Sequence, residues 1–291
     1  MARLKDLLRP VARKIGLASP AGAWDALGHS PWETPRTSGR PRACNVCHWT
    51  GTEFIDPSHC EMATCSRCGS IARDRFLLLS FLSRTPQRSG LRVLETSPRL
   101  GASYRRMMRR YFDYTASDYD LSAHEGDIRI DLQDIDLPSS SVDVLLTPHV
   151  LEHVPETERA LCEIHRVLAP GGRMYLQVPL LRGETIVPPE PEYHADNTLV
   201  FFNFGWDLTQ AIRSAGFAVR VLVTEQFSNV LTNRQVEPAD ADPQFDIPSM
   251  WRSVVTDDLE VVADARTSDV YGFSPAHQYV TWECIKSVDG N

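Results

Sequence analysis

The chain has 291 residues, 42% of them hydrophobic, and a formal net charge of −8, which suits a soluble globular protein of one large domain or two. Its apolar runs are all shorter than the roughly 20 residues of a membrane-spanning helix. Residues 1–10 lack the apolar core and cleavage site of a signal peptide. We therefore expect a cytoplasmic protein without a membrane span.

Charge is unevenly distributed along the chain. Residues 1–120 hold 19 Lys and Arg against 11 Asp and Glu, a net of +8, whereas residues 121–291 hold 11 against 27, a net of −16. The two halves either form solvated faces of opposite sign or provide a basic face for an acidic substrate. We favour solvated faces.

Residues 1–42 are predicted to form an N-terminal basic helix and a linker. Within residues 1–16, leucine, valine and isoleucine recur at helical spacing between Arg and Lys side chains. Residues 17–42 are rich in Gly, Pro, Ser and Thr, which is typical of a linker. Trp24 and Trp32 predict that this linker packs against the rest of the protein.

A cysteine-rich segment over residues 43–70 predicts a zinc-binding knuckle. Two C-x2-C pairs, separated by 17 residues, are formed by Cys44, Cys47, Cys65 and Cys68. Each pair places two thiolates on one turn, and two such turns make the tetrahedral sulfur cage that suits zinc. Four cysteines leave no position for water, so the zinc would be structural and would fold a segment with little core. Cys60, and less so His48 and His59, could replace one ligand.

Residues 69–82 predict a helix with a large apolar face that leads into the first strand of the next domain. Arg73 and Arg75 lie in this helix. They either line the mouth of a substrate site or form salt bridges on the helix surface, and the sequence favours neither.

Residues 91–104 predict a strand, a tight turn and a helix in succession. The apolar run Leu91 to Leu94 ends at Glu95, and a helical pattern follows through Arg110. Strand, turn and helix in this order begin the nucleotide site of a doubly wound sheet. Ser97 and Arg99 stand where a glycine-rich loop would have glycine, and only Gly101 remains.

Further motifs follow in a fixed order. Asp118 ends the next strand, 23 residues after Glu95, which is the distance at which a doubly wound fold presents a carboxylate to ribose hydroxyls. A buried strand over 142–146 precedes Val-Leu-Glu-His-Val at 150–154, and Val-Leu-Ala-Pro-Gly-Gly follows at 167–172. Over residues 90–223 this order resembles class I S-adenosylmethionine-dependent methyltransferases of type 11, here with an N-terminal four-cysteine zinc-ribbon segment.

The resemblance implies an α/β fold: a Rossmann-like, doubly wound, mostly parallel seven-stranded sheet with an antiparallel last strand, plus the small N-terminal zinc knuckle. The methyltransferase domain would cover residues 71–291. Helices are expected at 155–169 and 205–215, and strands at 173–178, 217–223 and 278–285. The connection over 226–277 is too long for a hairpin and is therefore expected to be an insertion: a lid, a dimer contact or a disordered loop.

The resemblance also implies which residues bind S-adenosyl-L-methionine. The methionine end would lie near Glu95, Thr96, Ser97 and Gly101. The ribose would bind Asp118, while the adenine would pack on Tyr119 and meet Asp131 and Leu132. The methyl group would lie near Thr147 and Pro148. Arg99 could crowd the methionine carboxylate or pair with it.

Histidine suits a general base near neutral pH, and His149, His153 and His194 are the catalytic candidates. His153 is expected in the first turn of a helix facing the cofactor, as a base or as a residue that only orients the loop. His194 belongs to residues 189–196, where this class reads its acceptor. The aromatic residues that follow would wall a pocket or join the core, and core is expected for half of them: Phe201, Phe202, Phe204 and Trp206.

The predicted function is methyl transfer to an oxygen or nitrogen atom of a small-molecule acceptor, as in bacterial natural-product or sugar biosynthesis. Two alternatives stay open: a methyltransferase for RNA such as ribosomal RNA, and a degenerate S-adenosylmethionine-binding scaffold protein. The knuckle has Arg67 alone against three acidic residues, so it lacks the basic surface that binds phosphates. A homodimer is also left open.

Overall fold

The computed structural model describes residues 29–37, 39–56, 63–87, 90–121, 126–194, 197–236, 244–273 and 279–288. The basic helix predicted for residues 1–16, Trp24, His59 and Cys60 lie outside these ranges. Among the helices in these ranges, none has the length and apolar character needed to cross a membrane.

One large sheet organises the chain. Its eight strands lie in the order β11 (Leu259–Ala263), β10 (Phe217–Thr224), β12 (Val280–Lys286), β7 (Leu168–Gln177), β6 (Val142–Pro148), β3 (Arg92–Thr96), β4 (Asp113–Asp118) and β5 (Ile128–Arg129). β12 runs antiparallel to both of its neighbours, and the remaining pairs are parallel. The predicted Rossmann-like sheet with an antiparallel last strand is thus confirmed, but the count of seven strands is wrong by one.

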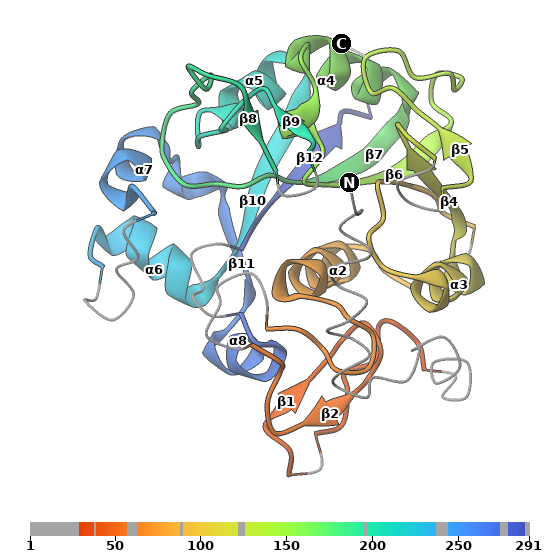
Figure 1. The fold of residues 1–291 in the computed structure, drawn as a ribbon, viewed down its shortest axis with the longest axis vertical. Coiled ribbons are helices and arrows are strands. Elements are labelled where there is room, and N and C mark those ends of the chain that lie inside the picture. Colours follow the sequence, from red (N-terminus) through yellow and green to blue (C-terminus); the bar gives the residue numbers. More distant parts are fainter. Residues whose placement is uncertain are drawn as a thin grey trace.

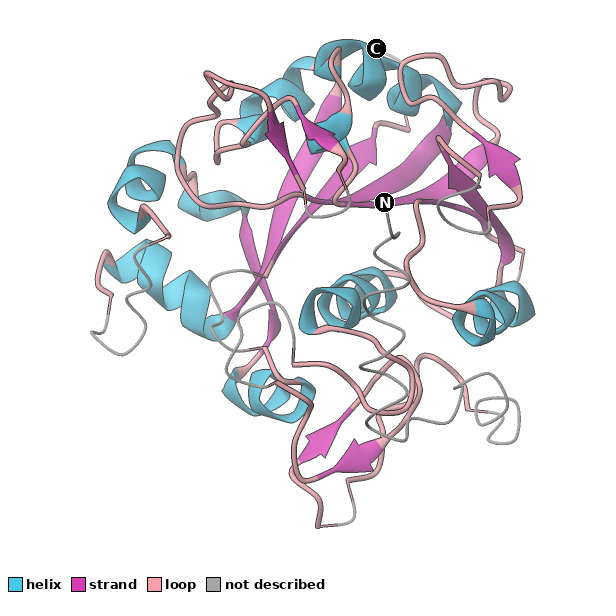
Figure 2. Ribbon diagram, viewed as in Figure 1, coloured by secondary structure: helices cyan, strands magenta, loops and turns pink. Residues whose placement is uncertain are grey.

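Helices cover both faces of the sheet (Figures 1 and 2). α2 (Ala72–Arg84) and α3 (Ala102–Tyr111) lie on one face, and α4 (Thr157–Val167) and α5 (Leu208–Ser214) lie on the other. Two apolar clusters fill the space between these layers. Side chains alternate between the faces of a strand, so neighbours on β6 serve different clusters: Leu145 packs under α4, while Val144 and Leu146 face α2 and α3.

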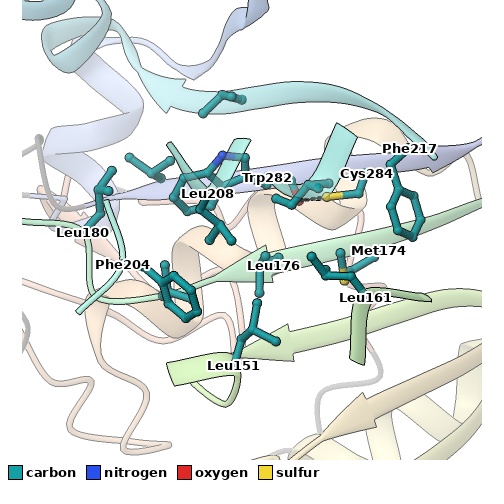
Figure 3. Close-up of a cluster of buried hydrophobic side chains, with 14 of the residues drawn as sticks. Leu151, Leu161, Met174, Leu176, Leu180, Phe204, Leu208, Phe217, Trp282 and Cys284 are labelled. Carbon is teal, nitrogen blue, oxygen red and sulfur yellow. Dashed lines mark hydrogen bonds between the residues drawn. The ribbon is translucent and has the colours of Figure 1, made fainter. Parts of the chain in front are cut away.

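The cluster under α4 and α5 is shown in Figure 3. Leu161 from α4 and Leu208 from α5 meet Leu176 on β7 and Trp282 on β12. The Trp282 indole is fully buried, and its Nε1 donates a hydrogen bond to Thr209 Oγ1 at 2.9 Å. A buried indole needs such an acceptor, so the antiparallel last strand is fixed against α5 as well as in the sheet.

The eighth strand comes from the predicted insertion, whose described part is built from regular elements. It contains α6 (Glu225–Asn233), α7 (Ile247–Ser253), a 3-10 turn (Thr256–Asp258), β11 and α8 (Ala265–Tyr271). Side-chain oxygens cap its three α-helices, with Thr224, Asp246 and Asp264 each accepting from the backbone at the helix start. β11 pairs in parallel with β10 and so extends the sheet by one strand.

The cysteine knuckle packs at the start of α2. Its two short strands, β1 (Arg42–Ala43) and β2 (Thr50–Gly51), form an antiparallel pair beside α8 (Figure 1). Arg42 pairs with Asp269 of α8. Trp32 of the preceding segment donates from Nε1 to the Thr85 carbonyl at 2.8 Å and packs on Phe112, with ring centroids 5.3 Å apart. The predicted packing of Trp32 is confirmed.

Candidate active site

The carboxyl ends of β3, β4 and β6 meet at one edge of the sheet. Thr96 is paired with Ser117 across β3 and β4, and Glu95 with Leu146 across β3 and β6. Parallel strands in register present the residues that follow them at the same edge. The structure therefore brings Ser97, Asp118 and Thr147 together, as the sequence predicted.

The turn after β3 is fixed by Ser97, which stands where glycine was expected. Ser97 has φ 47°, a left-handed backbone that glycine adopts freely and other residues adopt at a cost of roughly 1 kcal/mol. Its N–H donates to the Ser117 carbonyl at 2.7 Å, and its Oγ donates to Asp118 Oδ2 at 2.8 Å. Asp118 also accepts from the Asp120 N–H at 2.9 Å. Serine thus keeps the glycine-type turn and orients the carboxylate predicted to bind ribose.

Glu95 is buried beneath this turn. Its Oε2 accepts from the hydroxyls of Tyr104 at 3.0 Å and Tyr114 at 2.7 Å. Burial raises the pKa of Glu95 to about 7, although both tyrosine hydrogen bonds act to lower it. Burial beside this carboxylate also raises the pKa of both phenols. No role was predicted for the two tyrosines, although their positions on the apolar faces of a helix and a strand indicate buried rings that need a polar partner.

Arg99 pairs with Asp74 in the first turn of α2. The Asp74 carboxylate also accepts from the Ile71 N–H at 2.9 Å. A pocket opens at this point, and its lining includes Asp74, Glu95, Arg99, Tyr104 and Pro148. The helix that follows the knuckle therefore forms one wall of the space beside the strand ends.

The residues predicted for the adenine lie further along the same edge. Tyr119 is 61% exposed, and the Arg129 guanidinium lies 5.1 Å from the centroid of its ring. Asp131 accepts from the Gln133 N–H at 2.9 Å, so its carboxylate also caps a turn. The Leu132 side chain is buried in the core under α4, which leaves only its backbone for a ligand.

β6 ends in Thr147 and Pro148, the residues predicted to lie near the methyl group. Thr147 is fully buried, and its Oγ1 has no hydrogen-bond partner among the residues that the structure describes. A buried hydroxyl without a partner costs stability. Gly101 caps the start of α3, and a side chain there would meet open space.

His149 follows β6 directly and faces a cation. Its Nδ1 lies 3.3 Å from Arg73 Nη1 and 3.6 Å from Glu152 Oε1. Burial, and next the charge of Arg73, lower the pKa of His149 well below its usual range. His149 is therefore neutral at neutral pH. Arg73 reaches the site, as one of its two predicted roles requires, and is not confined to salt bridges on the helix surface.

His153 lies in a 3-10 turn (Leu151–His153), and α4 begins only at Thr157. His153 thus lies in a helical turn, as expected, but this turn is a separate 3-10 helix that ends, with Val154 as its C-cap, before α4 begins. His153 Nδ1 lies 2.7 Å from the Leu199 carbonyl. Its ring packs edge-on against that of His194, with centroids 4.7 Å apart. The structure thus brings all three predicted histidines to one region.

His194 comes from the hairpin of β8 (Glu192–Tyr193) and β9 (Leu199–Val200). The Phe201 N–H donates to the Glu152 carbonyl at 2.8 Å, so the hairpin is attached to the 3-10 turn. Of the four aromatic residues that follow His194, Phe204 and Trp206 are buried in the core and Phe201 and Phe202 are half-buried. The expectation that half of them are core residues is confirmed.

The four knuckle cysteines form a compact cluster. Cys44 Sγ lies 3.7 Å from Cys68 Sγ, and Cys47 Sγ lies 3.6 Å from Cys65 Sγ. Sulfur atoms around tetrahedral zinc are about 3.8 Å apart, given a Zn–S bond of about 2.3 Å. All four sulfur atoms lie within 4.8 Å of one another. The residues present therefore fit a structural zinc ion.

The two cysteine turns share one backbone design. After each pair comes a residue with left-handed backbone, His48 with φ 55° and Gly69 with φ 71°. Each donates its N–H to the carbonyl of the first cysteine of its pair, at 2.8 Å to Cys44 and 2.9 Å to Cys65. Ser70 Oγ lies 3.2 Å from Cys44 Sγ and 3.1 Å from Cys68 Sγ. Hydrogen bonds of this kind orient and stabilise metal ligands.

Charge in the cluster also favours a cation. Burial and then the neighbouring thiols raise the pKa of Cys68 well above its usual range. Burial would raise the pKa of Cys44 too, but hydrogen bonds from the other three thiols, and then the charge of Arg75, lower it well below its usual range. Four adjacent thiols cannot all ionise without a compensating cation.

Arg75 is fully buried behind the knuckle, so both roles predicted for it are wrong. It donates to three carbonyl oxygens: from Nε to Tyr271 at 2.8 Å, from Nη1 to Ser70 at 2.8 Å and from Nη2 to Ala63 at 2.7 Å. Its guanidinium lies 4.0 Å from the centroid of the Phe54 ring. Arg75 thus links the knuckle, α2 and α8.

The sequence matches a known protein family over residues that include β4 and β6. Residues 99–176, which run from the turn after β3 to the end of β7, match the family described as "Methyltransferase domain". Over these residues the chain is similar to a methyltransferase domain, and the rest of the chain lies outside the match. A protein described as an uncharacterized 37.1 kDa protein in transposon TN4556 of Streptomyces fradiae is 34% identical over 100 residues. That match covers 32% of this chain and 29% of the relative's own length.

Solved methyltransferase structures are similar to the domain at low identity. The YcgJ protein from Bacillus subtilis is 14% identical, with a TM-score of 0.42, 75% of this chain and 100% of that chain covered. Phosphoethanolamine N-methyltransferase 2 from Haemonchus contortus is 17% identical, with a TM-score of 0.42 and coverage of 81% and 55%. 1,6-Didemethyltoxoflavin-N1-methyltransferase from Burkholderia thailandensis is 15% identical, with a TM-score of 0.41 and coverage of 74% and 78%.

Proposed function

We propose that the protein transfers a methyl group from S-adenosylmethionine to an oxygen or nitrogen atom of a small-molecule acceptor. The observation that carries the proposal is the shared edge of β3, β4 and β6, where Ser97 orients the Asp118 carboxylate at 2.8 Å. The bound cofactor would supply a methyl group activated by its sulfonium. The protein supplies position and exclusion of water.

In this proposal the cofactor residues act at one edge of the sheet. Asp118 accepts hydrogen bonds from the ribose hydroxyls, because a carboxylate offers two acceptor oxygens. Tyr119 packs on the adenine, whose edge meets Asp131 and the backbone of Leu132. Thr96, Ser97 and Gly101 contact the methionine end through the backbone. Glu95 acts through the turn above it, since both of its tyrosine partners hold it below that turn.

The acceptor is proposed to bind between the 3-10 turn and the segment that joins β7 to α5. This segment carries exposed apolar side chains, Ile186, Val187 and Tyr193, which suit an acceptor with an apolar surface. His149, His153 and His194 face the same region. The Nδ1 of His149 faces Arg73, so His149 is suited to hydrogen-bond the acceptor from its other nitrogen. We place the small molecule in natural-product or sugar biosynthesis.

The zinc ion is proposed as structural. Cys44, Cys47, Cys65 and Cys68 would hold it, and its four thiolate ligands would leave no position for a reacting group. Through Arg75 the knuckle is connected to α2, and the first turn of α2 contacts the turn after β3. The zinc site therefore supports a wall of the active site without taking part in methyl transfer.

Calorimetry tests the proposal. The wild-type protein should bind S-adenosylmethionine and S-adenosylhomocysteine, whereas Asp118→Ala should lose binding without unfolding. Asp136→Ala, which changes an exposed carboxylate, is the matched control and should bind as the wild type does. Unchanged affinity of the Asp118 variant would refute the ribose assignment, and no binding of either ligand by the wild type would refute the proposed methyl transfer.

An acceptor screen that measures release of S-adenosylhomocysteine then separates the remaining alternatives. A small-molecule methyltransferase should turn over with low-molecular-weight acceptors and should not shift RNA in a gel. Tight RNA binding that weakens steeply with added salt would instead indicate an RNA methyltransferase, because phosphate contacts release counterions.

A further inference from the structure

Two histidines and a carboxylate converge at the acceptor side of the site. Glu152, His153 and His194 each offer one ligand atom, and the three atoms lie within 4.8 Å of one another. Glu152 is 1% exposed, and its Oε1 lies 3.9 Å from His153 Nε2. His194 approaches from the β8–β9 hairpin, with its ring 4.7 Å from that of His153. Two separate segments therefore supply the cluster.

The ring of His153 is oriented as a metal ligand would be. Its Nδ1 lies 2.7 Å from the Leu199 carbonyl, which can only accept, so Nδ1 carries the proton and donates. The lone pair then resides on Nε2, the atom that faces Glu152. Histidines that bind metals almost always donate the other ring N–H to a carbonyl or a carboxylate in this way.

We propose that Glu152, His153 and His194 bind a divalent transition-metal ion of the zinc class beside the acceptor. Two imidazoles and one carboxylate are a frequent ligand set for such ions, and three protein ligands leave a position for water or substrate. Ligand atoms around such an ion are about 3–3.5 Å apart, given bonds of about 2.0–2.2 Å. The 3.9 Å between Glu152 Oε1 and His153 Nε2 is close to this range, and His194 is exposed, so a rotation of its side chain can bring its ligand atom to the other two.

Two neighbours shape the charge around the ion. Arg73 contacts His149 at 3.3 Å, and His149 Nδ1 lies 3.6 Å from Glu152 Oε1. One carboxylate and two neutral imidazoles would leave a bound divalent ion with a net charge of +1. That charge favours an anionic or readily ionised oxygen in the open position. Exposed apolar side chains on the same hairpin and its approach, Val187 and Tyr193, suit the carbon skeleton of that acceptor.

The metal identifies the acceptor class, and this step rests on the proposed methyl transfer. We expect an acceptor with an ionisable hydroxyl, such as a phenol or an enol, because a bound cation lowers the pKa of a coordinated oxygen acid. The acceptor O–H bond breaks and its proton passes to water. The oxygen then forms a bond to the methyl carbon as the S–CH3 bond breaks, and the pair of electrons in that bond stays on sulfur, which leaves as neutral S-adenosylhomocysteine.

Metal counting on the full-length protein tests the site without any acceptor. After incubation with excess Zn2+ and desalting, the wild type should hold two zinc ions per chain, one in the four-cysteine cluster and one in the Glu152–His153–His194 cluster. His194→Ala and Glu152→Gln should each hold one. His194 lies on an exposed hairpin, so its substitution tests the site even if Glu152→Gln fails to fold.

A second three-residue group provides the matched control. His29, Glu33 and His48 also lie with ligand atoms within 4.8 Å of one another, near the knuckle. His29→Ala should retain both zinc ions if our assignment is correct. One ion in the wild type, or loss of the second ion in His29→Ala with retention in His194→Ala, would overturn it.

Cobalt spectroscopy assigns each ion to its ligands. Co2+ bound by four thiolates gives intense sulfur-to-metal charge transfer, whereas Co2+ bound by nitrogen and oxygen gives only weak ligand-field bands. His194→Ala should lose the weak bands and keep the charge-transfer bands. Binding of S-adenosylhomocysteine, measured separately, should be unchanged in this variant. If the wild type binds S-adenosylhomocysteine but holds no second metal ion, this inference alone is refuted. If the wild type holds the second metal ion but does not bind S-adenosylhomocysteine, the proposed methyl transfer alone is refuted.

Discussion

Replacement of Arg75 by methionine should destabilise the protein and release zinc. Methionine keeps the length and apolar stem of arginine but removes every donor. Three carbonyl oxygens would lose the hydrogen bonds that Arg75 donates, those of Ala63, Ser70 and Tyr271. The Ser70 carbonyl would keep its bond from the Cys65 N–H. The contact with the Phe54 ring would lose its cationic partner. One substitution thus disconnects the knuckle from α8.

The magnitude follows from these contacts. Hydrogen bonds that involve a charged group contribute about 1.5–3 kcal/mol each, and a desolvated cation–π contact adds about 2 kcal/mol. Burial of the guanidinium costs the wild type several kcal/mol of desolvation. The variant does not bear this cost, so it is subtracted from the sum. We therefore expect a net loss of roughly 4 kcal/mol in the free energy of unfolding. In a protein of this size that lowers the melting temperature by about 10 °C.

The assay is thermal unfolding followed by circular dichroism, together with zinc release to a chromogenic chelator. Arg67→Met is the matched control, because Arg67 lies on the same knuckle, is half-exposed and makes one hydrogen bond of 3.3 Å to the Cys47 carbonyl. The control should change the melting temperature by no more than about 3 °C. Equal melting temperatures and equal zinc release for the two variants would refute the role assigned to Arg75.

Three further predictions concern other positions. The folded protein holds the Glu95 proton up to a pKa of about 7, above the usual 4.5, so the stability that Glu95 contributes is full below pH 4.5 and declines towards pH 7. Glu95→Gln should remove that decline, which amounts to roughly 2 kcal/mol between denaturant titrations at pH 5 and pH 7.5; parallel profiles would contradict it. Gly272→Ala should lower the melting temperature measurably, because φ is 70° and the new Cβ would lie 2.7 Å from the Phe54 ring; an unchanged value would show that Phe54 moves freely. Cys65→Ser should release the structural zinc and expose the knuckle to limited proteolysis; a zinc-replete, protease-resistant variant would argue against the cage.

The order of strands could be predicted because local signals mark each strand end. Glu95 and Asp118 each follow an apolar run, and parallel pairing places them at one edge, whereas the Pro-Gly-Gly turn at 170–172 lies at the start of β7 and so at the opposite edge. The turn at Gly172 also has a local physical reason, since a Cβ there would lie 2.7 Å from the Ala169 carbonyl. The cysteine turns were equally readable, because each motif contains both of its ligands within four residues.

The features that could not be predicted depend on partners distant in sequence. Arg75 binds carbonyls 12 and 196 residues away, and backbone acceptors leave no mark in composition. β11 is a half-exposed edge strand within a polar insertion, so its apolar alternation is weak. The contact of Arg73 with His149 spans 76 residues, and only the packing of α2 against the strand ends brings these side chains together.

The central claim, that a nucleoside is bound where β3 and β4 end, is tested most directly by a crystal structure of the protein with S-adenosylhomocysteine. We predict the ribose hydroxyls within hydrogen-bond distance of the Asp118 carboxylate, the adenine on Tyr119 and the sulfur directed towards His149. A ligand bound on another surface would contradict the account. So would a structure at saturating ligand in which the Asp118 carboxylate is hydrogen-bonded only to Ser97 and Asp120.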